Sequence, residues 1–278
     1  MGDFEIDTRL HAMDANAGRF QGHLSRDWEI WGPNGGYLAA IALRAAGRMS
    51  RIPRPASFSG HFLRVASFGP VEVVVVPLHR GRRSESHRVS ITQDDKLVLE
   101  ALVRVAADGP GLEHVHEPLP AVPPPEALPD PASLRSADGP RYPFWSNLEA
   151  RVVQPERFQE PGRGRPPIWR EWYRFQPRAT FNDPFVDAGR MLLLIDTLSW
   201  PAASQPHPLD SGFQAPNLDV TAWFHELAPQ CEWLLADHVS PVARGGLMGT
   251  QGRIWSREGR LLATGGAQLF CVPTAPPR

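Results

Sequence analysis

The stretch GPNGGYLAAIALRAA, residues 32–46, predicts an alanine- and leucine-rich helix that begins on Pro-Asn-Gly-Gly. Its apolar residues continue at helical spacing, so we expect a largely buried helix over about 34–48. Gly35 and Gly36 carry no side chain, and backbone N–H groups at a helix N-terminus carry partial positive charge. A polarised carbonyl oxygen or a phosphate could therefore approach this end. Tight packing of the helix on strands explains the two glycines equally well.

Four strand-like runs, separated by turn residues, follow this helix at 58–66, 71–80, 84–93 and 97–106. In the second run, VEVVVV is apolar on both faces, which is typical of a strand covered by a helix on one side and a partner on the other. A second series repeats this order. The run FVDAGRMLLLIDTLSWPAA predicts a helix, and strand-like runs follow at 218–227, 232–241, 247–256 and 261–272. The chain therefore uses one helix-plus-strands unit twice.

The repeated unit predicts an α+β fold in which antiparallel strands wrap a long apolar helix, the hot-dog layout. Two units predict a double hot-dog with one continuous sheet; an ordinary α+β sandwich fits the strand count but leaves the repeat unexplained. The run EPLPAVPPPEALPDP, residues 117–131, can hold neither a helix nor a central strand. We expect an N-terminal repeat over 1–110, a proline-rich linker over 111–145 and a C-terminal repeat over 146–278.

The composition narrows the class of protein. The 278 residues are 42% hydrophobic, enough for a sizeable core, and 29 basic against 30 acidic residues leave a net charge of -1. We therefore expect no nucleic-acid partner and no attraction to an anionic membrane. The sequence contains no run of 18 apolar residues, so we expect no membrane span. With only Cys231 and Cys271 and no signal-peptide pattern, we expect a cytoplasmic protein with free thiols.

Familiar catalytic and metal motifs are missing from the sequence. There is no G-x-S-x-G elbow, phosphate-binding P-loop or H-E-x-x-H zinc motif. His114 and His116 have no further cysteine or histidine pair to complete a metal set, so we expect no metal and no cofactor. The run HRGRRSESHR, residues 79–88, could bind phosphates or form a solvated hairpin through its arginines Arg80, Arg82, Arg83 and Arg88.

The second helix places a carboxylate on its apolar face. Asp196 follows Leu192 and Leu193 at helical spacings of four and three residues. Burying an unpaired carboxylate costs several kcal/mol, so we expect Asp196 to be hydrogen-bonded or to have a raised pKa. Both states suit a general base. A structural aspartate paired with backbone or arginine groups is the alternative.

Two amides lie on runs that should wrap this helix. Asn217 precedes one run and Gln268 lies in the last, beside Gly265 and Gly266. Neutral amides can orient a water or donate to an oxyanion without adding charge. Ordinary hydrogen bonds in the core or at a sheet edge explain either residue equally well. Asp219, two residues after Asn217 and on the same strand face, is the alternative carboxylate.

Taken together, these pieces resemble the TesB-like acyl-CoA thioesterases, double hot-dog enzymes that hydrolyse fatty acyl-CoA. The resemblance covers most of the chain outside the linker. It rests on GPNGGYLAAIAL, on SFSGHFLR with RGRRSESHRVSITQ, on LIDTLSW, and on LDVTAWFHE with GRLLATGGAQL. In that family an Asp, a Ser or Thr, and a Gln activate a water that attacks the thioester carbonyl.

The resemblance assigns roles to particular residues. The Asp is Asp196, the hydroxyl position is occupied by Asn217, and the Gln is Gln268 if a bulge at Gly265–Gly266 shifts the strand by one residue relative to Ala267. Asp196 would accept a proton from water, Asn217 and Gln268 would orient that water, and amides near Gly36 would stabilise the oxyanion. Gly35 and Gly36 would leave room for the thioester carbonyl or the pantetheine arm. The nucleotide end of CoA would meet Arg80, Arg82 and Arg83.

Two other functions remain open on the same scaffold. The amide at Asn217, where the family carries a hydroxyl, also fits a non-catalytic protein that binds acyl-CoA. The run FNDPFVDA, residues 181–188, faintly resembles a hydratase motif but lacks its histidine, which makes an enoyl-CoA hydratase the weaker alternative. Hot-dog sheets tend to associate, so a homo-oligomer is possible.

Overall fold

The computed structural model describes residues 1–134, 142–155, 165–208 and 211–274. The N-terminal half begins with short elements and continues with a long helix and four long strands. In chain order these are α1 (Phe4–Asp7), β1 (His11–Asp14), β2 (Arg19–Leu24), η1 (Arg26–Trp28), α2 (Gly35–Met49), β3 (Pro55–Phe62), β4 (Gly69–Arg80), β5 (Ser84–Gln93) and β6 (Lys96–Ala106).

The C-terminal half repeats this order after three short 3-10 helices. These are η2 (Pro125–Ala127), η3 (Pro131–Ser133) and η4 (Pro143–Asn147). The half itself contains β7 (Leu148–Val152), β8 (Ile168–Phe175), α3 (Pro184–Thr197), α4 (Ser199–Ser204), β9 (Phe213–Gln214), β10 (Asp219–Phe224), β11 (Trp233–Arg244), β12 (Leu247–Ser256), β13 (Leu261–Gly266), β14 (Gln268–Phe270) and β15 (Val272–Pro273).

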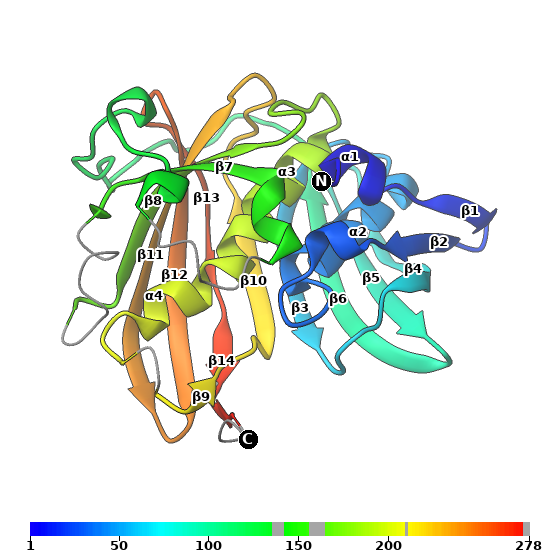
Figure 1. Cartoon of the computed structure of the whole chain (residues 1–278). Helices are drawn as coiled ribbons and strands as arrows, with labels where there is room; N and C mark the ends of the chain where they lie inside the picture. Colours follow the sequence, from blue (N-terminus) through cyan, green and yellow to red (C-terminus); the bar gives the residue numbers. More distant parts are fainter. Residues whose placement is uncertain (135–141, 156–164, 209–210, 275–278) are drawn as a thin grey trace.

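One continuous antiparallel sheet joins the two halves (Figure 1). Its order is β1-β2-β4-β5-β6-β3-β10-β13-β12-β11-β8-β7, and β14 pairs with β12. The seam lies between β3 and β10, where Ser59 is opposite Thr221. From this seam, the strands β3-β6-β5-β4-β2 follow in one direction and the equivalent strands β10-β13-β12-β11-β8 follow in the other. A short strand, β1 or β7, ends the sheet at each edge. The predicted double hot-dog is confirmed, and the sandwich alternative is wrong.

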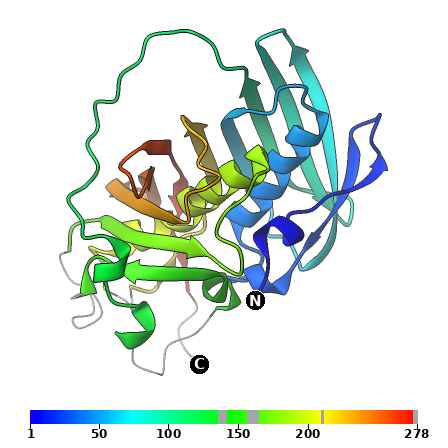
Figure 2. The same ribbon diagram turned by 90° about the horizontal axis from the view of Figure 1, so that it is seen from above.

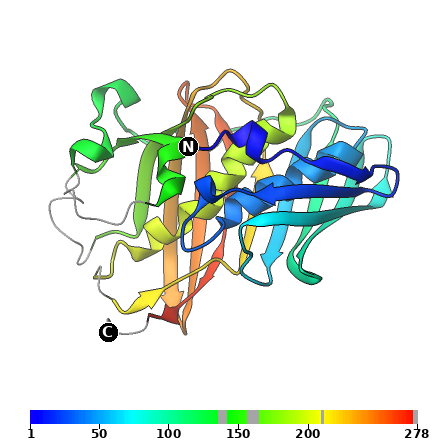
Figure 3. The same cartoon turned by 45° about the vertical axis from the view of Figure 1, so that its right-hand side comes forward.

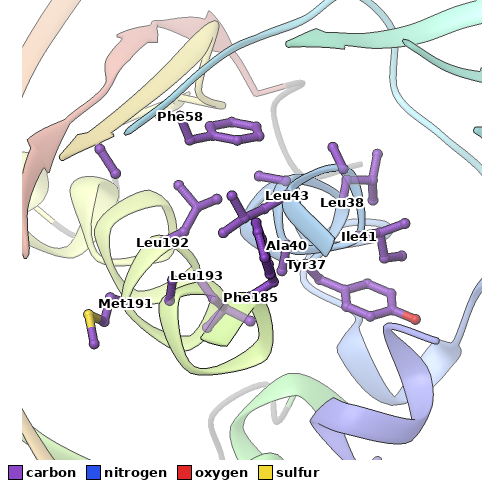
Figure 4. Packing of buried hydrophobic residues seen from close by; sticks show 14 of the residues in the cluster. Tyr37, Leu38, Ala40, Ile41, Leu43, Phe58, Phe185, Met191, Leu192 and Leu193 are labelled. Atoms are coloured by element: carbon purple, nitrogen blue, oxygen red, sulfur yellow. The ribbon is translucent and has the colours of Figure 1, made fainter. Parts of the chain in front are cut away.

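The two long helices lie side by side inside the curve of the sheet (Figures 2 and 3). Leu192, Leu193 and Phe185 of α3 project toward α2 in Figure 4, and the leucines are fully buried. Small residues lie at this contact: a Cβ added at Gly189 would be in van der Waals contact with the Cβ of Ala40, at 3.4 Å. Ten of the fifteen residues of α2 are buried, in agreement with the largely buried helix predicted from its apolar composition.

The helix predicted over 185–203 is divided into α3 and α4 at Leu198. Pro201 explains the division, because it has no N–H to donate to the carbonyl of Thr197 and its ring would clash there. Asp183 caps the start of α3, where its side chain accepts the N–H of Phe185 at 2.8 Å. The break between α3 and α4, at Leu198, lies two residues after Asp196.

The proline-rich segment packs across the outer face of the C-terminal half, and its trace runs around the outside of the molecule in Figure 2. Its apolar side chains contact a cluster of buried residues on β8, β11 and β12. Trp172 of that cluster donates its indole N–H to the carbonyl of Pro123 at 3.0 Å. Glu117 forms an ion pair with Arg253 at 2.9 Å. The segment thus serves as a covering layer as well as a connection.

Within the described residues, no helix combines the length and apolar character needed to cross a bilayer. The two cysteines are unpaired; Cys231 is buried and Cys271 is partly exposed.

Candidate active site

The end of α3 meets the start of α2, and Asn34 links them. Its Oδ1 accepts the N–H of Tyr37 at 2.9 Å and so caps α2, while its Nδ2 donates to Thr197 Oγ1 at 3.0 Å. Capping of this kind satisfies one of the N–H groups that a helix leaves open at its start. The positive end of α2 is therefore held against the last turn of α3.

Asp196 lies at this junction with only 3% of its surface exposed. Asn217 donates from Nδ2 to Asp196 Oδ1 at 2.6 Å and to the Asp196 carbonyl at 2.8 Å. The backbone N–H of Gly36 also donates to the carboxylate. Burial raises the pKa of Asp196 to about 7, although the hydrogen bonds from Asn217 and Gly36 favour the charged form and lower it. A carboxyl group with this pKa exchanges protons near neutral pH.

The two glycines of α2 are required by contact with α3 and β3. A Cβ at Gly36 would lie 2.8 Å from Leu193 Cα and 3.1 Å from Asp196 Cβ. A Cβ at Gly35 would lie 2.9 Å from the ring of Phe62 and 3.1 Å from Asp196 Oδ2. The expectation that both glycines leave room for a ligand is therefore corrected, because Gly36 is packed against α3 and its N–H is used by Asp196.

One backbone donor remains at this helix start. The N–H of Gly35 has no hydrogen bond to any of the described residues, whereas Gly36, Tyr37 and Leu38 have partners in Asp196 or Asn34. Gly35 is also partly exposed, while Gly36 is buried. Its N–H is therefore the donor at this helix start that a ligand can reach.

Gln268 does not reach Asp196, which corrects the expectation from the sequence. It lies on β14 opposite Gly249, with its side chain exposed, while its neighbours Ala267 and Leu269 are buried. Successive side chains of a strand alternate between faces, so the inward positions belong to Ala267 and Leu269. The strand breaks at Ala267, but the predicted bulge does not turn Gln268 inward.

Two hydroxyl groups to which the sequence assigned no role lie beside the inward-facing Ala267. Thr250 Oγ1 lies 3.1 Å from the N–H of Ala267 and 2.8 Å from Ser199 Oγ. Ser199 Oγ donates to the carbonyl of Ile195 at 2.9 Å, one turn back along the chain. Both side chains are buried. Nothing in the alternation of the strand distinguishes Thr250 from a structural residue, so only the structure could find this pair.

The remaining predicted residues lie apart from the Asp196 junction. Asp219 Oδ1 accepts the N–H of Gln268 at 3.1 Å and so links β10 to β14. Arg82 and Arg83 lie in the β4–β5 hairpin, and Arg80 donates to the carbonyl of Met49 at the C-terminal end of α2. Asp196 lies at the N-terminal end of α2. The length of α2, about 20 Å at 1.5 Å per residue, therefore separates the arginine hairpin from Asp196.

Sequence comparison now identifies the family. The acyl-CoA thioesterase N-terminal domain matches residues 24–106, and the acyl-CoA thioesterase C-terminal domain matches residues 119–272. The chain belongs to the acyl-CoA thioesterase family. The C-terminal match contains Asp196, Asn217 and Gln268, and the N-terminal match contains both glycines of the α2 start.

Solved structures share the fold of this chain over nearly its whole length. A conserved protein of unknown function with hot dog fold from Alicyclobacillus acidocaldarius is 22% identical, with a TM-score of 0.80 and full coverage of both chains. A tesB protein from Mycobacterium avium subs paratuberculosis is 26% identical, with a TM-score of 0.79, covering 98% of this chain and 99% of that one. A putative thioesterase II from Thermobifida fusca is 22% identical, with a TM-score of 0.81 and coverage of 98% and 99%.

No group of three or more His, Cys, Asp or Glu side chains that could hold a metal ion occurs in the described ranges. The groups at the Asp196 junction are a carboxyl group, an amide and backbone N–H groups.

Proposed function

We propose that this protein hydrolyses an acyl-CoA thioester to a free acid and CoA, with Asp196 as general base. The observation that carries the proposal is a buried carboxyl group with a pKa of about 7, adjacent to a helix start. A base is most effective when its pKa is near the working pH, because it is then both available and strong enough to remove a proton. A carboxyl group with an ordinary pKa would be a weaker base.

Asn217 holds this base in position. Its Nδ2 makes two contacts with Asp196, which fix Oδ1 and leave Oδ2 facing the start of α2. Its own Oδ1 has no hydrogen bond to the described residues and can accept one from a water. We therefore assign Asn217 the role of orienting both the carboxylate and the attacking water.

The reaction follows from these positions. Asp196 removes a proton from water as the water oxygen bonds to the thioester carbon, and the carbonyl oxygen becomes an oxyanion. The Gly35 N–H donates to this oxyanion, aided by the partial positive charge of the α2 start. The tetrahedral intermediate then collapses, the C–S bond breaks and CoA leaves as a thiolate. The thiolate takes up the proton that Asp196 removed from water. Gln268 has no part in this scheme, because its side chain is exposed.

The test follows thiol release from acyl-CoAs of several chain lengths. Wild type should release thiol, and Asp196→Asn should lower kcat by at least about 10³-fold, since amide cannot act as the base. Asn217→Ala should lower kcat by about 10- to 100-fold by freeing the carboxylate. Circular dichroism and thermal unfolding establish that each variant is folded.

Other results would favour the other functions. Saturable acyl-CoA binding without thiol release would support a non-catalytic binding protein, a function favoured by the missing inward glutamine. Loss of enoyl absorbance without thiol release would support a hydratase. Asp196→Asn with undiminished thiol release would overturn the role of Asp196.

A further inference from the structure

The internal repeat creates a second junction equivalent to the one at Asp196. Asn34 and Asp183 are the N-caps of α2 and α3, and thirteen residues after each lie Gly47 and Asp196. Two residues after each N-cap lie Gly36 and Phe185. Asp196 contacts Gly36 at one end of the helix pair, and Gly47 contacts Phe185 at the other. The two ends are thus related by the approximate twofold symmetry of the fold.

The second junction has lost the groups proposed for hydrolysis. Gly47 provides no carboxylate, and a Cβ at this position would lie 2.6 Å from the ring of Phe185. The aromatic ring therefore occupies the space that a carboxylate would need. The second junction therefore cannot carry out the general-base chemistry proposed for Asp196.

The second junction nevertheless opens into a pocket of about 310 Å³. Small-molecule sites typically have volumes of about 300–1,000 Å³, so the pocket is large enough for a group of modest size. Its lining includes Arg44, Arg48, Arg51, Ser50, Asp183 and Phe185. Three arginines and one aspartate therefore line the pocket, and one of these arginines, Arg51, is paired with the buried Glu85 behind it.

The arginines of this pocket keep unused donors. Arg44 is largely buried, with 14% of its side chain exposed, and Nη1 donates to the Glu5 carbonyl at 2.5 Å and to Thr8 Oγ1 at 3.0 Å. Asp183 lies 3.7 Å from its Nε, longer than a hydrogen bond. Arg51 uses Nε to bind the buried Glu85 at 2.6 Å. Arg48 is exposed and forms no ion pair or hydrogen bond with the described residues.

Charges of both signs surround Arg44. Burial lowers the pKa of Arg44, Asp183 and Glu5 raise it, and the like charges of Arg9 and Arg48 lower it again. An anion in the pocket would offset both the repulsion and the burial. Arg80, which donates to the Met49 carbonyl at 3.3 Å, adds a further positive charge at the same end of α2.

We propose that this arginine-lined pocket binds a phosphate or pyrophosphate group of an organic phosphate. Guanidinium groups suit this ligand because their planar N–H donors match phosphate oxygens in pairs. The group can come from the nucleotide end of CoA or from a free nucleotide. The binding proposal does not depend on catalysis at Asp196.

Isothermal titration with pyrophosphate, ADP and CoA tests the pocket directly. Wild type should bind at least one probe saturably, Arg48→Ala should weaken that binding about tenfold or more, and Arg48→Glu should abolish it. Arg48 is exposed and unpartnered, so these variants should fold normally. Arg104→Ala, which removes an exposed arginine from β6, is the matched control and should bind as wild type does. No saturable binding of any probe, or an equal loss in Arg104→Ala, would overturn the proposal.

Kinetics then distinguish the source of the phosphate. If it belongs to the substrate, Arg48→Ala should raise KM for acyl-CoA about tenfold and leave KM for the matching acyl-pantetheine unchanged. If it belongs to a free nucleotide, both KM values should stay unchanged while ADP binding is lost. Either pattern supports the site. An inactive wild type that still binds pyrophosphate through Arg48 would refute the hydrolase but keep the pocket.

Discussion

The raised pKa of Asp196 predicts an unusual dependence of stability on pH. An ordinary aspartate has a pKa of 3.8, and that of Asp196 is about 7 in the folded chain. The folded state therefore binds this proton more tightly than the unfolded state does. The resulting stabilisation is complete below pH 4 and is lost as the pH rises through 7. At 1.36 kcal/mol per pKa unit, the loss amounts to about 4 kcal/mol.

Asp196→Asn removes this titration. The free energy of unfolding of the variant, minus that of wild type, should increase by about 4 kcal/mol between pH 4 and pH 8. Urea unfolding at four or five pH values measures this difference. The matched control is Asp95→Asn, because Asp95 is exposed in a turn at φ 58, a conformation that asparagine tolerates. A difference that stays constant with pH, or that the control reproduces, would refute the reasoning about Asp196.

The same proton should appear in catalysis. If ionised Asp196 is the base, kcat/KM for an acyl-CoA should rise about tenfold per pH unit below 7 and level off above it. A profile that is flat between pH 5 and pH 8 would contradict this assignment.

Three further predictions concern the packing of Gly36, the exposed side chain of Gln268 and the buried ion pair of Asp187 with Arg190. Gly36→Ala should destabilise the fold by about 1–3 kcal/mol in urea unfolding and should lower kcat, because its Cβ would press on Leu193 and Asp196; wild-type stability would contradict the packing. Gln268→Ala should leave kcat/KM within about twofold of wild type, since the side chain is exposed, and a large loss would restore it to the site. Asp187→Asn should cost about 3–5 kcal/mol of unfolding free energy, because the fully buried Arg190 would lose its carboxylate partner; an unchanged melting temperature would show that the ion pair is dispensable.

The long elements could be predicted from hydrophobic periodicity. The helix expected over 34–48 is α2, Gly35–Met49, and both series of long strands were expected from their apolar runs. The two outermost strands at each side of the sheet, β1 and β2 and β7 and β8, were not predicted. β1 is exposed along its whole length, and the buried positions of β2 include a glycine, so neither carries a strong apolar alternation. β8 mixes aromatic and charged residues on both faces, because the sheet and the linker cover different parts of it.

The site was predictable where local geometry controls it. Helical spacing placed Asp196 on the buried face of α3, and the structure brings Asn217 to it. The sequence wrongly predicted that the side chain of Gln268 points to Asp196. Which face of the sheet this side chain occupies depends on the alternation of side chains along β14, where Ala267 and Leu269 take the buried positions. The hydrogen bond between Thr250 and Ser199 joins residues 51 positions apart, and no local sequence pattern predicts it.

By itself, the sequence determined the repeat, its long helices and the burial of one carboxylate, because the pattern of each helix and strand depends on residues within a few turns of one another. The tertiary structure decided which helix end meets which side chain. At one junction a glycine start receives Asp196, and at its symmetry mate Phe185 fills the space against Gly47. Two copies of one unit have therefore acquired different chemistry, because contacts between distant segments depend on the packing of the whole sheet around both helices.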